Sequence, residues 1–139
     1  MASCKAVICG INDYPTPNDL PSCVNDARAV ATLLQDRYDC HDSNLHIVLN
    51  REATVDKLES ELEWLLSDAP ASEWLLFYFS GHGFTDLVDG VMQEFLVLLD
   101  ESGNPRLWKD DRLVALTQEV PEGKLTLLVD ACHSGGMNQ

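Results

Sequence analysis

The sequence predicts an α/β fold in which a mostly parallel sheet carries helices on both of its faces. Residues 74–79 are uniformly apolar, which is typical of a strand that is covered on both sides, and residues 125–129 form a second apolar run. Apolar residues with helical spacing lie elsewhere along the chain. Because strands and helices alternate, we expect parallel strands joined by crossover helices.

The N-terminal part of the chain predicts one strand and one helix. Residues 5–11 form an apolar run that ends in the turn-rich residues 12–19. A helix follows, with Asn25 or Asp26 as its N-cap. Its apolar positions recur at helical spacing and would face the sheet: Ala27, Val30, Ala31, Leu34 and Tyr38.

The middle of the chain repeats this arrangement. Residues 46–49 predict a short second strand, and Thr54 can cap a second helix that Pro70 ends. This helix also has an apolar stripe: Val55, Leu58, Leu62, Leu65 and Leu66. The run at residues 74–79 is then the third main strand.

The C-terminal part predicts a short strand, a turn, a short helix and the fourth main strand. Residues 95–99 form the short strand, and residues 101–105 form a turn. Asp110 or Asp111 can cap a helix that ends near Leu116. No internal repeat or linker divides the sequence, so we expect residues 1–139 to form one domain.

The charge and composition argue against several classes of function. The chain has 23 acidic residues against 9 Lys and Arg, a net charge of −14, whereas nucleic-acid binding needs a basic face. An acidic surface favours basic peptides, although solubility explains the charge equally well. No apolar run has the length of about 20 residues that crosses a bilayer, and the start lacks a signal peptide. We therefore expect a cytoplasmic protein with neither nucleic acid nor membrane as a partner.

The five cysteines favour neither disulfides nor zinc. Their number is odd, no C-x-x-C pair occurs, and thiols in the cytoplasm stay reduced. Cys132 differs from the others because the polar and glycine residues 133–136 follow it directly. A buried cysteine is usually inert packing, but this context favours a nucleophile at the carboxyl end of a strand.

Four histidines could act as the base for such a thiol. His41 and His46 flank a short strand in polar surroundings and are most simply surface residues. His133 follows Cys132 directly, and adjacent side chains at a strand end diverge. His82 ends the run at residues 74–79 between two glycines, which permit a tight turn and leave the Gly83 N–H open to a substrate oxygen. His82 is therefore the better base.

These motifs resemble those of metacaspases, in the caspase-like clan of cysteine peptidases. The matching residues are Phe79-Ser80-Gly81-His82-Gly83, Asp130-Ala131-Cys132-His133-Ser134-Gly135 and Cys23-Val24-Asn25-Asp26-Ala27. His82 precedes Cys132 by 50 residues, the spacing of the related caspase signature. The resemblance implies a caspase-like three-layer sandwich. It implies no organic cofactor.

The resemblance also implies a role for each matching residue. Cys132 would attack the scissile carbonyl, and His82 would act as base and then protonate the leaving amine. The N–H groups of Gly83 and Cys132 would form the oxyanion hole. The residues that would line the pocket for the substrate side chain before the cleaved bond are Cys23, Asp26, Ser80 and Asp130.

Two carboxylates in one cleft favour a cationic side chain. Asp26 and Asp130 suit a guanidinium or ammonium group, so we expect peptide or protein substrates with Arg or Lys before the cleaved bond, rather than Asp. Asp26 could also be a helix N-cap, and the two roles are compatible.

The resemblance further implies calcium, which metacaspases commonly require. The matching acidic residues are Asp110, Asp111 and, from the loop after His82, Asp86 or Asp89. Calcium needs several oxygen ligands. Gln93-Glu94 stands where the family often has an Asp-Glu pair, and Asn138 and Gln139 stand where an acidic residue often follows. Asp110 and Asp111 could instead be a helix cap and a solvated turn.

In this family a small subunit usually follows the cysteine motif, and this chain stops seven residues after Cys132. The chain could be a processed large subunit, a single-module relative, or one half of a pair whose partner chain supplies the small subunit. Residues 125–129 would then form an exposed apolar edge. Besides the peptidase, a caspase-like scaffold or dormant large subunit stays open. A hydrolase of small amides or esters has no feature in its favour.

Overall fold

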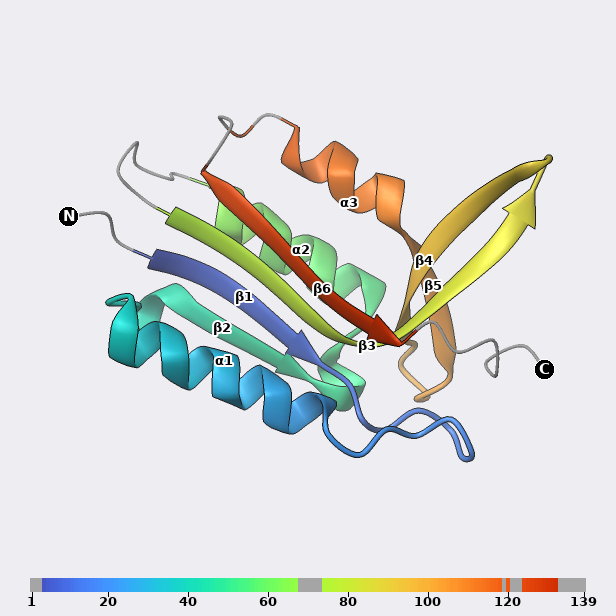
Figure 1. Cartoon of the computed structure of the whole chain (residues 1–139), viewed down its shortest axis with the longest axis horizontal. Helices are drawn as coiled ribbons and strands as arrows, with labels where there is room; N and C mark the ends of the chain where they lie inside the picture. The colour runs from blue at the N-terminus through green and yellow to red at the C-terminus, as the bar shows by residue number, and fades with distance from the viewer. Residues whose placement is uncertain (1–3, 68–73, 119, 121–123, 133–139) are drawn as a thin grey trace.

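The computed structural model of the chain describes residues 4–67, 74–118, 120 and 124–132 (Figure 1). Six strands form one sheet in the order β2-β1-β3-β4-β5, and β6 pairs with β3. The strands are β1 (Cys4–Gly10), β2 (Leu45–Leu49), β3 (Trp74–Val88), β4 (Val91–Leu99), β5 (Pro105–Lys109) and β6 (Leu125–Cys132). The helices are α1 (Cys23–Arg37), α2 (Val55–Leu66) and α3 (Asp110–Thr117).

The sheet is mostly parallel, and helices cover both of its faces. β1 lies between β2 and β3, and β6 lies along the first half of β3; all these pairs are parallel. α1 lies on one face, and α2 and α3 lie on the other (Figure 1). The two faces contribute to separate apolar cores, one with Ala27 and Leu34 of α1, the other with Leu62 of α2 and Leu113 of α3. The predicted α/β class is confirmed.

β3 is longer than the apolar run predicts. The sequence suggested a turn at the glycines around His82, but the strand continues to Val88 and pairs with β4 as an antiparallel hairpin. The tight turn lies at Asp89 and Gly90, whose φ angles are 52° and 79°. Asp-Gly is typical of such two-residue hairpin turns because both positions require positive φ. β4 accordingly begins before Phe95, and β5 was not predicted.

The sequence predicted the N-cap of one helix, α2, correctly and the N-caps of α1 and α3 wrongly. Thr54 caps α2, and its hydroxyl accepts from the Lys57 N–H at 3.1 Å. α1 begins at Cys23 with Ser22 as N-cap, so neither Asn25 nor Asp26 is the cap. The side chain of Asn12 instead accepts from the Val24 N–H at 3.0 Å, so a distant loop satisfies one of the first donors of α1.

The start of α3 also differs from the prediction. Its N-cap is Lys109, and Asp110 is its first helical residue. The Lys109 cap has no side-chain hydrogen bond. The interpretation of Asp110 or Asp111 as the cap is therefore wrong by one or two residues, within the usual variation of helix ends.

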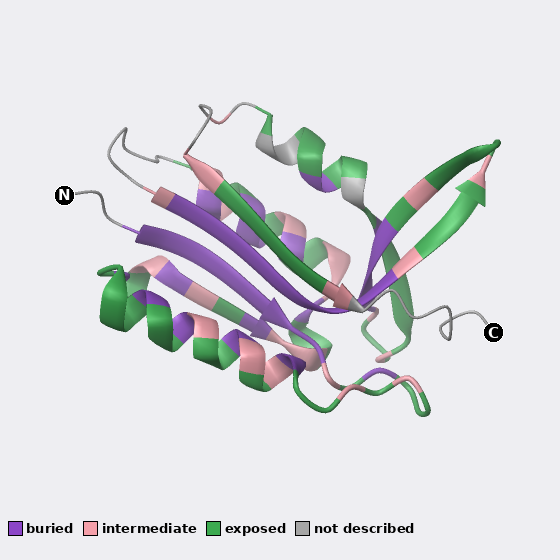
Figure 2. Cartoon of the chain, viewed as in Figure 1, coloured by how far each residue is buried: buried purple, intermediate pink, exposed green. Residues whose placement is uncertain are grey.

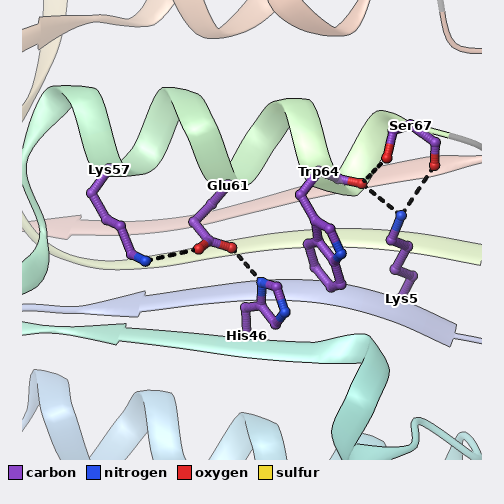
Figure 3. A network of polar contacts seen from close by, with 6 residues as sticks. All are labelled: Lys5, His46, Lys57, Glu61, Trp64 and Ser67. Atoms are coloured by element: carbon purple, nitrogen blue, oxygen red, sulfur yellow. Dashed lines mark hydrogen bonds and ion pairs between the residues drawn. The ribbon is translucent and has the colours of Figure 1, made fainter.

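A polar network fastens α2 to the sheet on the side away from α1 (Figure 3). The Lys5 amine on β1 donates to the carbonyl oxygens of Trp64 at 2.6 Å and Ser67 at 3.1 Å, at the end of α2. His46 on β2 stacks on Trp64 and pairs with Glu61. His46 is therefore a partner of α2, not a plain surface residue. No helix in the described part of the chain has the length and apolar character to cross a membrane.

Candidate active site

His82 and Cys132 occupy matching positions on neighbouring parallel strands. The register of β3 and β6 pairs Ser80 with Asp130, Gly81 with Ala131, and His82 with Cys132. Neighbouring strands lie about 4.8 Å apart, so the backbones of the two residues are side by side. Cys132 is the last residue of β6, at the carboxyl edge of the sheet. The Cys132 side chain and residues 133–139, His133 included, lie outside the described residues.

The His82 ring is held in one tautomer. The side chain is 4% exposed, and Nε2 lies 2.6 Å from the Asn18 carbonyl oxygen. A carbonyl oxygen only accepts, so Nε2 carries the proton and Nδ1 of the neutral ring has the free lone pair. Nδ1 is buried and has no hydrogen-bond partner among the described residues. The ring therefore presents an available basic nitrogen.

Tyr14 contacts both the backbone and the ring of His82. Its hydroxyl accepts from the His82 backbone N–H at 3.0 Å and donates to the Val97 carbonyl at 2.6 Å. The two rings lie 4.6 Å apart between centroids. A Cβ at Gly81 would come within 2.5 Å of the Tyr14 hydroxyl, so this position requires glycine. The sequence analysis missed Tyr14 and Asn18, and the turn-rich composition of residues 12–19 was the only signal.

Gly83, the predicted second donor of the oxyanion hole, directly follows His82 on β3. It is buried and in register with Leu96 of β4, within the hairpin. Its role as an oxyanion donor stays a prediction. The tight turn expected there does not form, because the backbone is extended through this glycine.

The four predicted pocket residues gather on the face of the sheet that α1 covers. Ser80 is in register with Gly10 on one side and Asp130 on the other. Cys23 and Asp26 lie in the first turn of α1, and a Cβ at Gly10 would meet the Cys23 carbonyl oxygen at 2.7 Å. Ser80 and Cys23 are buried, Asp26 is half-buried and Asp130 is exposed. The group therefore extends from the interior to the surface.

Tyr78 lies beside this group and was also missed. It is buried, two residues before Ser80 on the same face of β3. Burial raises the pKa of the Tyr78 phenol, a hydrogen bond with Ser80 lowers it, and the charges of Asp130 and Asp26 raise it further. Both carboxylates are therefore near one phenol, although they come from β6 and α1. The resemblance named no tyrosine in this position.

Comparisons with known proteins show the family of the chain. Residues 4–139 match the family model described as metacaspase, peptidase C14 domain. The chain belongs to the metacaspase family. It is 34% identical to Metacaspase-1 of Schizosaccharomyces pombe over 95% of this chain, and 31% identical to Metacaspase-1 of Arabidopsis thaliana over 94%.

The chain spans only part of its relatives. It covers 34% of the Schizosaccharomyces pombe metacaspase and 39% of the Arabidopsis thaliana one. A crystal structure of protein GSU0716 from Geobacter sulfurreducens has the same fold, with a TM-score of 0.71 and 22% identity; the match covers 96% of this chain and 52% of that protein. The fold of this metacaspase domain thus agrees with that crystal structure.

The residues predicted to bind calcium are partly separated. Asp86 lies on β3 in the hairpin and Asp89 at its turn, not in a loop after His82. Asp111 and Glu94 line a shared cavity of about 370 Å³ with Met92 and Gln93. These two carboxylates would supply only part of the roughly six to eight oxygen ligands that calcium takes. Among the described residues, no group of three His, Cys, Asp or Glu side chains could hold a metal; the Asp110 side chain lies outside them.

Proposed function

We propose that this chain is the catalytic module of a cysteine endopeptidase that cleaves after Arg or Lys. Cys132 is the nucleophile and His82 the base. The observation that carries the proposal is the β3–β6 register, which pairs His82 with Cys132 while Nδ1 of His82 has no partner among the described residues. A buried imidazole whose second nitrogen is held by a backbone carbonyl is arranged as a general base.

The reaction follows from these groups. Nδ1 of His82 takes the Cys132 thiol proton, and the thiolate attacks the scissile carbonyl carbon. The C–N bond then breaks, His82 returns the proton to the leaving amine, and a thioester forms on Cys132. Water hydrolyses the thioester with His82 again as base. The Gly83 and Cys132 N–H groups would bind the oxyanion, and losing one such donor typically costs about 3–4 kcal/mol of barrier.

The preference for Arg or Lys rests on the two carboxylates near Tyr78. Asp26 and Asp130 come from α1 and β6, and the charges of both act on the Tyr78 phenol. A guanidinium group can bridge carboxylates with several N–H donors, whereas an acidic substrate side chain would be repelled.

The test is cleavage of matched peptides that differ only in Arg, Lys or Asp before the scissile bond. We expect cleavage after Arg and Lys, and loss of activity in Cys132→Ala and His82→Gln. The glutamine amide can still donate to the Asn18 carbonyl, so the second variant removes the base with little change in packing. Cys9→Ala is the matched control, because burial raises the pKa of the Cys9 thiol and keeps it protonated. Cleavage by Cys132→Ala, or a preference for Asp, would refute the proposal.

The exposed edge of β6 favours a second chain segment as a partner. Among the described residues β6 pairs with β3 alone. Leu127, Leu128 and Val129 are 37%, 49% and 42% exposed, and β6 shows as an exposed edge (Figure 2). An apolar strand with one unpaired edge is open to further pairing. In the proposal, a small-subunit strand of the kind found in longer family members adds to this edge.

This edge also supports the alternative of a scaffold or dormant large subunit that needs a partner for activity. Light scattering, which measures the oligomeric state, is combined with the peptide assay. Together they distinguish the active peptidase from the scaffold or dormant large subunit. A monomer that cleaves Arg peptides by itself excludes the scaffold, whereas cleavage only after a small subunit is added supports the dormant subunit. The proposal places the enzyme in the reducing cytoplasm, where Cys132 stays a thiol.

A further inference from the structure

We propose that Tyr78 is a specificity-determining residue, whose hydroxyl at the base of the substrate pocket favours Arg over Lys. The inference rests on the proposed function and deepens it, because it distinguishes two cationic side chains that Asp26 and Asp130 alone would both attract. Its basis is the position of the phenol among the four pocket residues.

The register places Tyr78 one step deeper than Ser80. The two residues point to the same face of β3, with Ile8 and Gly10 beside them on β1, and Leu128 and Asp130 beside them on β6. Ser80, Gly10 and Asp130 are nearer the carboxyl edge, where a substrate would enter. A side chain that enters from this edge therefore meets Ser80 before Tyr78.

α1 covers the phenol from above. Tyr78 belongs to the same apolar core as Ala27 and Ala31 of α1, and it is 5% exposed. The start of this helix is held close to the sheet at Gly10, where a Cβ would lie 2.8 Å from the Ala27 Cβ. The Tyr78 ring thus lies under α1, one register step deeper than Ser80, and the proposal places its hydroxyl at the inner end of the substrate pocket.

The four predicted pocket residues all influence the Tyr78 phenol. The phenol hydrogen-bonds with Ser80 and interacts electrostatically with Asp130, Asp26 and Cys23. Burial and the two negative charges raise the pKa of the phenol, so it stays neutral at physiological pH. A neutral phenol offers both a donor and an acceptor. It can donate within the pocket while its oxygen accepts from a ligand.

The phenol oxygen of Tyr78 distinguishes Arg from Lys because the two side chains differ in length and in the arrangement of their N–H donors. The guanidinium group has five N–H donors in a plane, so it can contact carboxylates at its sides and a further acceptor at its end. The Lys ammonium is a compact charge on a shorter side chain, and water or one carboxylate can satisfy its donors. The phenol oxygen therefore adds a contact for Arg that Lys does not require.

The test is the Tyr78→Phe variant, which keeps the ring and removes the hydroxyl. Tyr38→Phe is the matched control, since Tyr38 is 50% exposed at the far end of α1. We expect kcat/KM for an Arg peptide to fall about 2- to 10-fold through KM, the effect of one neutral hydrogen bond, while the matched Lys peptide changes less. The Arg-to-Lys ratio thus falls in Tyr78→Phe and not in Tyr38→Phe.

A binding measurement separates this inference from the proposed function. Agmatine, which carries a guanidinium group, and cadaverine, which carries an ammonium group, are titrated calorimetrically into Cys132→Ala with and without Tyr78→Phe. A selective loss of agmatine affinity supports the inference. If Cys132→Ala prefers agmatine and the wild type prefers Arg peptides, but Tyr78→Phe keeps the same ratios in both measurements, the inference is wrong and the proposed function stands. If Cys132→Ala binds neither amine and the wild type cleaves neither peptide, both are wrong.

Discussion

Nε2 of His82 lies 2.6 Å from the carbonyl oxygen of Asn18, a residue 64 positions earlier in the chain. A backbone carbonyl therefore orients the imidazole, where many hydrolases use a carboxylate side chain. The loop that carries Asn18 is itself anchored, because the Asn12 N–H donates to the Asn50 side chain at 2.9 Å. The position of the base thus depends on a loop, and the side chain at position 18 is not the orienting group.

We first predict that Tyr14→Phe weakens both folding and catalysis. The variant removes the hydroxyl that accepts from the His82 N–H and donates to the Val97 carbonyl. Leaving buried polar groups unpaired costs about 1–3 kcal/mol, which urea denaturation would detect, and kcat should fall. Asn18→Ala is the control, because it keeps the backbone carbonyl and should retain kcat. Wild-type stability in Tyr14→Phe would contradict the role assigned to this hydroxyl.

A second prediction concerns Gly10→Ala. The added methyl group would lie 2.7 Å from the Cys23 carbonyl oxygen and 2.8 Å from the Ala27 Cβ, so α1 must shift away from β1. We expect a loss of about 1–3 kcal/mol in the free energy of unfolding and a raised KM for Arg peptides, because Cys23 and Asp26 move with the helix. Gly90→Asn is the control. A Cβ at Gly90 would meet no atom within 4 Å, and asparagine tolerates the φ of 79° at this position. Equal stability of the two variants would argue against the close packing.

The third prediction is a pH dependence that originates at Glu61. Burial raises the pKa of this carboxyl, but hydrogen bonds from His46 and Lys57 outweigh it and hold the pKa below its ordinary value of 4.5 (Figure 3). Because the folded pKa is lowered, the carboxylate stabilises the fold at neutral pH. This contribution is lost as the pH falls from 4.5 through the folded pKa.

Denaturation from pH 3 to pH 7 would measure this effect. Glu61→Gln should be less stable than the wild type at pH 7 by about 1–2 kcal/mol, and the difference should shrink below pH 4.5. Glu63→Gln is the matched control, since Glu63 is exposed on the same helix. A stability difference that is the same at all pH values would show that charge at Glu61 is not its source.

Calcium binding is the fourth prediction, with Asp111 and Glu94 as ligands on one cavity. Calcium that binds only the folded chain should raise Tm with increasing concentration in the wild type. The shift should decrease strongly in Asp111→Asn and stay unchanged in Asp36→Asn, a control at an exposed position on α1. Removal of calcium with a chelator should reverse the shift. A Tm that does not respond to calcium in the wild type would exclude this site.

The local sequence pattern was sufficient to predict the central strands and the start of α2. The apolar runs predicted β1, the first part of β3, and β6. β1 and the first part of β3 are buried on both faces, which favours apolar residues on both sides of the strand. Thr54 was recognised as a cap because its hydroxyl satisfies a backbone donor only three residues away. The hairpin was missed because the glycines around His82 were interpreted as a turn. Gly81 is needed instead for the close approach of the Tyr14 hydroxyl.

The sequence by itself determined the α/β class, the metacaspase motifs and the expectation that His82 and Cys132 meet at one sheet edge. These follow from local residue types and from the rule that parallel strands end on the same side. Only the tertiary structure decided the tautomer of His82, the support by Tyr14 and the place of Tyr78 beneath Ser80. Each depends on contacts between strands, helices or loops that are distant in the chain, and such contacts leave no periodic pattern in the sequence.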